Sequence, residues 1–122
     1  MKKAKVFLAE DDKNLLRLEK NVLQLEGHEI VIVACSRQEA LTKLSEAKEL
    51  GVDVAVIDGN LGTGPNDGPE VARVLRETIN GIKIISFSGD IVEWGDCNPA
   101  KPRDIVNLGK TVTEIISGGK RK

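Results

Sequence analysis

The chain has 122 residues, of which 40% are hydrophobic and 30% charged, and its formal net charge is −1. This length suits one domain with one core, and the composition is ordinary for a globular protein. A charge so close to zero gives no field that favours nucleic acid, and no apolar run approaches the roughly 20 residues of a membrane span. We therefore expect one cytoplasmic domain over residues 1–122 that binds neither nucleic acid nor membranes.

Histidine and cysteine offer little for catalysis. His28 is the only histidine, and its place directly after Gly27 predicts a polar residue at the start of a strand. Cys35 and Cys97 lack the spacing of a metal site, so we expect two reduced thiols. Ser–His and Cys–His catalysis therefore have few options.

Short apolar runs alternate with segments in which apolar residues recur at helical spacing. In chain order they predict a strand over 5–9, a helix over 14–26, a strand over 29–34, a helix over 36–50, a strand over 52–57, a loop over 58–69, a helix over 70–78, a strand over 82–87 and a last helix over 103–117. Asp12 is expected to cap the first helix, and Ser36 with Glu39 fits the capping box that opens the second.

The segment 89–100 is less regular. It has one short apolar group, Ile91–Val92 with Trp94, among glycine, aspartate, asparagine and proline. It has room for one helical turn or none, and a short fifth strand could precede Lys101. The whole order predicts a doubly wound α/β fold, a parallel five-stranded sheet with helices on both faces, in which the fourth helix is short or missing.

Chemically useful side chains follow the ends of the predicted strands. The first strand runs into Glu10 and Asp11, the third into Asp58 and the fourth into Ser88, with Lys101 further on. Because ligands bind at the C-terminal edge of open parallel sheets, we expect these groups to meet there. Clustered carboxylates repel one another and raise one another's pKa, so the set favours a cation, and oxygen ligands suit Mg²⁺.

The same groups suit phosphoryl chemistry. Asp58 is a candidate nucleophile that would form an aspartyl phosphate. Ser88 can donate a hydrogen bond to a phosphoryl oxygen, and Mg²⁺ with Lys101 would offset the charge of the phosphoryl group. Any one of the acids alone is more simply a solvated group at a strand end, so the prediction depends on the whole set.

These residues resemble the bacterial response-regulator receiver domain, over nearly the whole chain. Glu10–Asp11 matches the family's acidic pair, and Asp58 matches its phosphoacceptor at the end of the third strand. Ser88 is similar to its Ser/Thr, and Asp67–Gly68 resembles the Asp-Gly before its third helix. Lys101–Pro102 resembles its Lys-Pro, where the peptide bond is usually cis. The resemblance implies the flavodoxin-like (receiver) topology.

The resemblance also implies a role for each site residue. Asp58 would accept a phosphoryl group from a histidine kinase or phosphotransfer protein, and Ser88 and Lys101 would bind its oxygens. The chain would then be a signalling module of a two-component phosphorelay, with an unknown downstream protein as its second partner. It would not be an enzyme beyond its own Mg-dependent phosphorylation and dephosphorylation. The implied Mg²⁺ ligands are Asp11, Asp58 and the backbone carbonyl of Asn60, with Glu10 acting through water.

The sequence departs from the family in two places. Gly62 stands where the family usually has proline, and the loop 62–66 looks longer than usual, so we expect a mobile connection there. The interval between Ser88 and Lys101 is shorter than usual, the chain has no tyrosine, and Asn98 stands roughly where the switch aromatic would be. We expect an atypical output face on an intact acceptor site. Trp94 either packs over the sheet edge where the fourth helix would be or is a lone apolar anchor for the loop.

Other functions remain as alternatives. A degenerate receiver that binds a protein partner without phosphorylation is the main one, and the irregular segment 89–100 motivates it. An aspartate-nucleophile phosphatase would need a general acid two positions after Asp58, where Asn60 stands. Flavin binding is disfavoured because the clustered acids would repel a flavin phosphate. Nucleotide binding is disfavoured because no glycine-rich loop follows the first strand.

Overall fold

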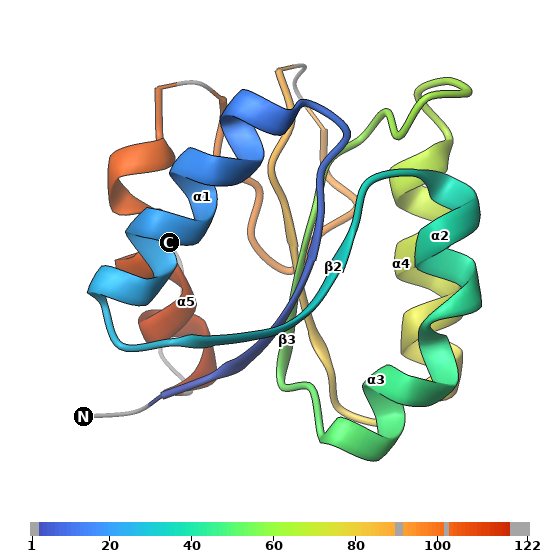
Figure 1. The fold of residues 1–122 in the computed structure, drawn as a ribbon, viewed down its shortest axis with the longest axis horizontal. Helices are drawn as coiled ribbons and strands as arrows, with labels where there is room; N and C mark the ends of the chain where they lie inside the picture. The colour runs from blue at the N-terminus through green and yellow to red at the C-terminus, as the bar shows by residue number, and fades with distance from the viewer. Residues whose placement is uncertain (1–2, 90–91, 102, 118–122) are drawn as a thin grey trace.

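The structure is a computed structural model, and it describes residues 3–89, 92–101 and 103–117. The strands are β1 (Lys5–Ala9), β2 (Glu29–Ala34), β3 (Val54–Ile57) and β4 (Lys83–Ser86), and the helices are α1 (Lys13–Leu25), α2 (Arg37–Thr42), α3 (Leu44–Leu50), α4 (Asp67–Thr78), the 3₁₀ turn η1 (Ile105–Asn107) and α5 (Leu108–Ile116). The strands form one parallel sheet, which α1 and α5 cover on one face and α2, α3 and α4 on the other (Figure 1).

The predicted doubly wound α/β fold is confirmed, with a four-stranded sheet instead of the expected five-stranded one. The order β2-β1-β3-β4 is that of the flavodoxin-like topology. Where a fifth strand was expected, the described residues make two isolated parallel bridges, Ile85–Cys97 and Ser88–Ala100. Pro99 lies between them and has no N–H to donate, so it interrupts the ladder.

Side chains of the segment 92–101 supplement the few backbone hydrogen bonds that it makes with β4. The segment holds turns and single bridges but no helix, in keeping with a fourth helix that is short or missing. Asp96 Oδ2 accepts the N–H of Ile84 on β4 at 2.7 Å, and Asn98 Oδ1 accepts the hydroxyl of Ser86 at 2.5 Å. Carboxylate and amide groups thus close part of the outer edge of β4.

Trp94 occupies part of the face that α4 also covers. Its ring packs against the buried cluster between the sheet and the helices α2 to α4. Arg76 of α4 donates a hydrogen bond to the Trp94 carbonyl at 3.1 Å and lies 3.6 Å from Asp96. These contacts fit both expected roles of Trp94, packing over the sheet edge and anchoring the loop.

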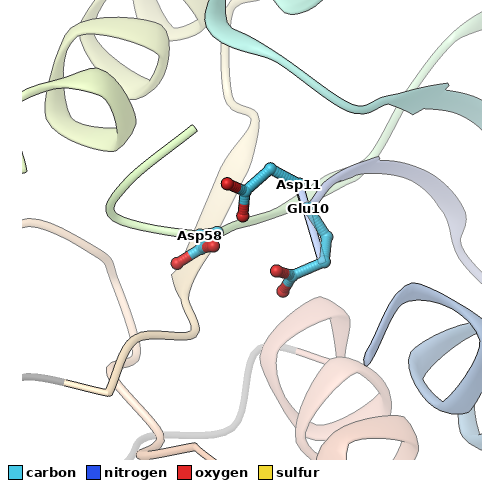
Figure 2. Close-up of side chains that lie close together, drawn as sticks. All are labelled: Glu10, Asp11 and Asp58. Carbon is cyan, nitrogen blue, oxygen red and sulfur yellow. The ribbon is translucent and has the colours of Figure 1, made fainter. Parts of the chain in front are cut away.

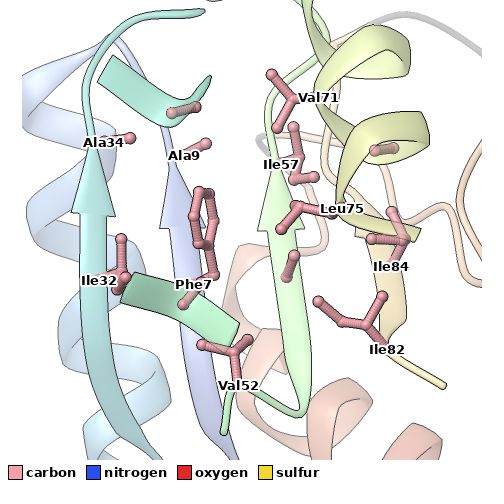
Figure 3. Packing of buried hydrophobic residues seen from close by; sticks show 14 of the residues in the cluster. Phe7, Ala9, Ile32, Ala34, Val52, Ile57, Val71, Leu75, Ile82 and Ile84 are labelled. Carbon is pink, nitrogen blue, oxygen red and sulfur yellow. The ribbon is translucent and has the colours of Figure 1, made fainter. Parts of the chain in front are cut away.

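Both faces of the sheet are buried, as in other parallel sheets. Along β1, Phe7 and Ala9 belong to the cluster on the α2–α4 side, whereas Val6 and Leu8 belong to the cluster on the α1–α5 side. Figure 3 shows the first cluster, in which Phe7 lies among side chains from neighbouring strands. A shift of β1 by one residue relative to its neighbours would move each of its side chains to the opposite face of the sheet. Packing on both faces therefore fixes the register of β1 and with it the position of Glu10.

Three of the predicted helices differ clearly from the prediction. The last helix, predicted over 103–117, is the 3₁₀ turn η1 followed by α5. The single helix predicted over 36–50 is broken at Lys43, which has φ −105° and ψ 11° and donates from Nζ to the Val33 carbonyl at 2.9 Å. Helix α4 begins at Asp67, inside the predicted loop. Pro69 does not prevent this, because the first turn of a helix does not use its N–H.

The Asp12 cap, the Ser36 cap and the structural role of His28 are confirmed, whereas Glu39 Oε1 accepts the N–H of Cys35 at 2.6 Å and not that of Ser36, as a capping box would require. Asp12 accepts two N–H groups of the first turn of α1, and Ser36 Oγ accepts the N–H of Glu39 at 3.0 Å. His28 is buried, and its Nδ1 accepts the Ala4 N–H at 3.0 Å, which leaves the proton on Nε2. Both cysteines are free thiols. Within the described ranges, no helix has the length and apolar character to cross a membrane.

Gly68 at the start of α4 should not tolerate a side chain. A Cβ there would lie 2.5 Å from the Asp58 carbonyl oxygen and 2.8 Å from both Gly59 Cα and Trp94 Cζ2. We predict that Gly68→Ala lowers the free energy of unfolding by about 1–3 kcal/mol in urea denaturation, because packed backbone must move. Gly89→Ala is the control, since a Cβ there meets nothing within 4 Å. Equal losses in both variants would contradict this account.

Candidate functional site

Three carboxylates meet at the C-terminal edge of the sheet. Glu10 and Asp11 follow β1 and Asp58 follows β3, and one oxygen of each lies within 4.8 Å of the others (Figure 2). Glu10 is 1% and Asp58 8% exposed, whereas Asp11 faces solvent. The structure therefore brings the predicted acids together in a half-open cluster, as parallel pairing of β1 with β3 requires.

Lys101 joins this cluster from the far end of the chain. Its Nζ lies 2.8 Å from Glu10 Oε1 and 3.1 Å from Asp58 Oδ2, and its side chain is 10% exposed. Burial alone would lower the pKa of Lys101, but its bonds to Glu10 and the charge of Asp58 outweigh burial and raise it. The lysine is therefore a fixed cation between the two acids.

The positive charge of Lys101 offsets only part of the negative charge of the three carboxylates. Burial raises the pKa of Asp58, the charge of Glu10 raises it further, and Lys101 opposes both. Burial likewise raises the pKa of Asp11, and the neighbouring Asp58 adds to this. A divalent cation would relieve this repulsion and displace protons, so its affinity should increase with pH.

A small cavity of about 150 Å³ adjoins the Asp58 carboxylate. Ser88 is 5% exposed, and its Oγ lies 3.2 Å from the position that a Cβ on Gly59 would take. The bare Gly59 backbone thus leaves Ser88 close to the loop that follows Asp58. The lining residues are Asp58, Gly59, Asn60, Pro65, Ser88, Gly89 and Val92.

Asp67 organises the loop that follows Asp58, a role that the sequence did not reveal. Its buried carboxylate accepts the N–H groups of Leu61, Thr63 and Gly64 at 2.9, 2.8 and 3.1 Å, and also the Thr63 hydroxyl. Burial would raise the pKa of Asp67, but these hydrogen bonds outweigh it and lower the pKa. The loop 62–66 is therefore tied to the start of α4 rather than being the free connection that we expected.

Glu19 of α1 is a second residue that sequence reasoning missed. It is 1% exposed, and neither oxygen has a hydrogen-bond donor. Burial, followed by the nearby Glu10, raises the pKa of Glu19 to about 10, so the side chain is a neutral acid at pH 7. Its spacing from Leu16 and Leu23, on the buried face of α1, was the available signal.

Replacing Glu19 should stabilise the protein at neutral pH. Above pH 4.5 the unfolded chain loses this proton while the folded chain keeps it to about pH 10, so stability from this group is complete below 4.5 and falls as pH rises. We predict that Glu19→Gln gains up to about 3 kcal/mol at pH 7 and flattens the decline in stability between pH 5 and 9. Urea denaturation across this range tests it, with the same change at exposed Glu77 as control. A wild-type slope in Glu19→Gln would refute it.

The family comparison agrees with this geometry. Residues 6–93 match the response regulator receiver domain. The chain belongs to this family. As a receiver domain of a two-component response regulator, it carries Glu10, Asp11, Asp58 and Ser88 inside the matched range. Lys101 lies outside residues 6–93, and its place in the site is seen only in the folded structure, where it contacts Asp58.

Solved structures of receiver domains share the fold. A CheY-like receiver domain protein from Methanospirillum hungatei JF-1 has a TM-score of 0.79 at 21% identity, covering 96% of each chain. A response regulator from Thermotoga maritima has a TM-score of 0.76 at 23% identity, covering 95% of this chain and 99% of that one. A receiver domain protein from Clostridium thermocellum has a TM-score of 0.77 at 21% identity, covering 94% and 95%. No curated protein sequence matches the chain.

Pro102 lies outside the described residues, so the expected cis bond after Lys101 stays a prediction.

Proposed function

We propose that this receiver domain is a Mg²⁺-dependent phosphoacceptor, in which Asp58 takes a phosphoryl group from the phosphohistidine of a histidine kinase or phosphotransfer protein. The observation that carries the proposal is the Lys101 ammonium between Glu10 and Asp58, beside a cluster of three carboxylates. The receiver fold alone would be compatible with an inactive site. A complete set of acids, hydroxyl and lysine favours an active one.

The donor set suits Mg²⁺. Carboxylate oxygens within 4.8 Å of one another are hard ligands, and Mg²⁺ binds through one or two carboxylates while keeping several waters. Asp11, Asp58 and the Asn60 carbonyl would hold the ion directly, and Glu10 through water. When bound, the ion would draw negative charge from the phosphoryl oxygens.

The remaining steps belong to the side chains. A carboxylate oxygen of Asp58 attacks the phosphorus, the bond from phosphorus to the imidazole nitrogen breaks, and the imidazole leaves with its electron pair. Lys101 Nζ, already 3.1 Å from Asp58 Oδ2, can bind a phosphoryl oxygen of the product, and the Ser88 hydroxyl can donate to another. On this proposal the chain catalyses only its own phosphorylation and dephosphorylation, and it signals by contact with a further protein.

Phosphorylation is predicted to depend on Asp58 and on Mg²⁺. Wild-type protein incubated with Mg²⁺ and acetyl phosphate should show a single phosphoryl adduct by intact mass spectrometry, and EDTA or Asp58→Asn should abolish it. Asp53→Asn is the matched control, because Asp53 precedes the same strand and accepts a hydrogen bond from the backbone N–H of Lys5 at 2.9 Å. A folded wild type that binds Mg²⁺ but gains no adduct would overturn the proposal.

Ser88 is predicted to connect the phosphoryl group to the segment 92–101. Trp94 is the only tryptophan, and its ring lies 3.9 Å from the Cβ position of Gly59, which Ser88 also contacts. We expect Trp94 fluorescence to change on phosphorylation of the wild type and to change less in Ser88→Ala, although that variant is still phosphorylated. A wild-type fluorescence change in phosphorylated Ser88→Ala would show that the coupling does not use this hydroxyl.

The second candidate is a receiver that binds its partner without phosphorylation. It is favoured by the output side, where the described residues make two bridges in place of a fifth strand and no helix before them. Binding of a partner that is unchanged by Asp58→Asn would select this function over phosphoacceptance.

A further inference from the structure

The peptide bond between Asn60 and Leu61 is held from one side by a buried anion. Asp67 Oδ2 accepts the N–H of Leu61 at 2.9 Å, and Asp67 is 3% exposed. In a planar trans peptide the N–H of one residue and the C=O of the preceding residue point in opposite directions. The bond to Asp67 therefore turns the Asn60 carbonyl away from the Asp67 carboxylate.

Neighbouring contacts leave this peptide little freedom to rotate. The Leu61 side chain is 1% exposed in the core, and the Leu61 carbonyl accepts the N–H of Arg37 at 3.3 Å. The amide oxygen of the Asn60 side chain accepts the N–H of Gly62 at 2.9 Å. The side chain of Asn60 is thus engaged in its own turn, which leaves the main-chain carbonyl as the group available to a ligand.

Asp67 directs its hydrogen bonds to this loop rather than to the helix that it begins. Asn66 is the N-cap of α4 and makes no side-chain capping bond, and the Asp67 carboxylate reaches back to three backbone N–H groups between residues 61 and 64. An anion that accepts the N–H of a peptide also polarises that peptide and increases the negative charge on its carbonyl oxygen.

We propose that Asp67 is a positioning residue for the divalent cation, because it fixes and polarises the Asn60 carbonyl through the N–H of the same peptide. This inference rests on the proposed function, in which that carbonyl is a metal ligand. It adds a residue that does not touch the ion and that tunes how tightly the ion binds.

The test is Mg²⁺ affinity measured by isothermal titration calorimetry on the unphosphorylated protein. Asp67→Asn removes the negative charge and leaves a weaker amide oxygen to accept the three N–H groups that Oδ2 accepts, and we expect its Kd for Mg²⁺ to rise about tenfold. Thr63→Val removes only the hydroxyl bond to Asp67 and should change the Kd less than twofold. Val71→Ala, which loosens the packing of α4 in the core, should lower stability but leave the Kd unchanged.

The outcomes separate this inference from the proposed function. No Mg²⁺ binding by the wild type would overturn both. Binding by the wild type and by Asp67→Asn with the same Kd would overturn the inference alone, as would an equal loss of affinity in Val71→Ala. If Asp67→Asn does not fold, nuclear magnetic resonance of the wild type decides, because Mg²⁺ should shift the amide nitrogen of Leu61. An unshifted resonance under saturating Mg²⁺ would contradict the proposal.

Discussion

Repulsion among the carboxylates at the end of β1 and β3 is the constraint around which this edge of the molecule is organised. Parallel pairing with both faces buried leaves β1 and β3 no freedom of register, so Glu10, Asp11 and Asp58 must lie together. Lys101 offsets part of their charge, but burial, and after it the neighbouring carboxylates, still raise the pKa values of Asp11 and Asp58. The fold thus maintains an electrostatically unfavourable arrangement of carboxylates at this edge of the sheet.

Two further buried acids near the site, Glu19 and Asp67, differ in their protonation. Glu19, beneath Glu10, avoids adding a further negative charge by keeping its proton. Asp67, which binds the loop that follows Asp58, stays ionised because three backbone N–H groups and a hydroxyl surround it. The two buried acids differ because one has donors and the other has none. Local hydrogen bonding, more than distance from the cluster, decides which of the two is charged.

Much of the fold and site could be predicted from the sequence, because apolar runs define the strands and the strand ends define the site. The bounds of β1 and β2 are as predicted, and the positions of Glu10, Asp11, Asp58 and Ser88 follow from the ends of β1, β3 and β4. The break at Lys43 could not be predicted, since the helical pattern is continuous there and the bond to Val33 is tertiary. The roles of Glu19 and Asp67 were equally hidden, because acidic residues on helices usually face solvent and only packing shows otherwise.

The segment that follows Ser88 has a consequence for how this protein can evolve. A helix or a strand keeps its hydrogen bonds in the main chain, so most of its side chains can be exchanged without loss of the element. Here only some of the hydrogen bonds to β4 are between main-chain groups, whereas Asp96 and Asn98 make others with their side chains and Trp94 packs against the core. Sequence drift in this short stretch is therefore restricted as it would be in an active site, and relatives that share this architecture should be recognisable by these three residues.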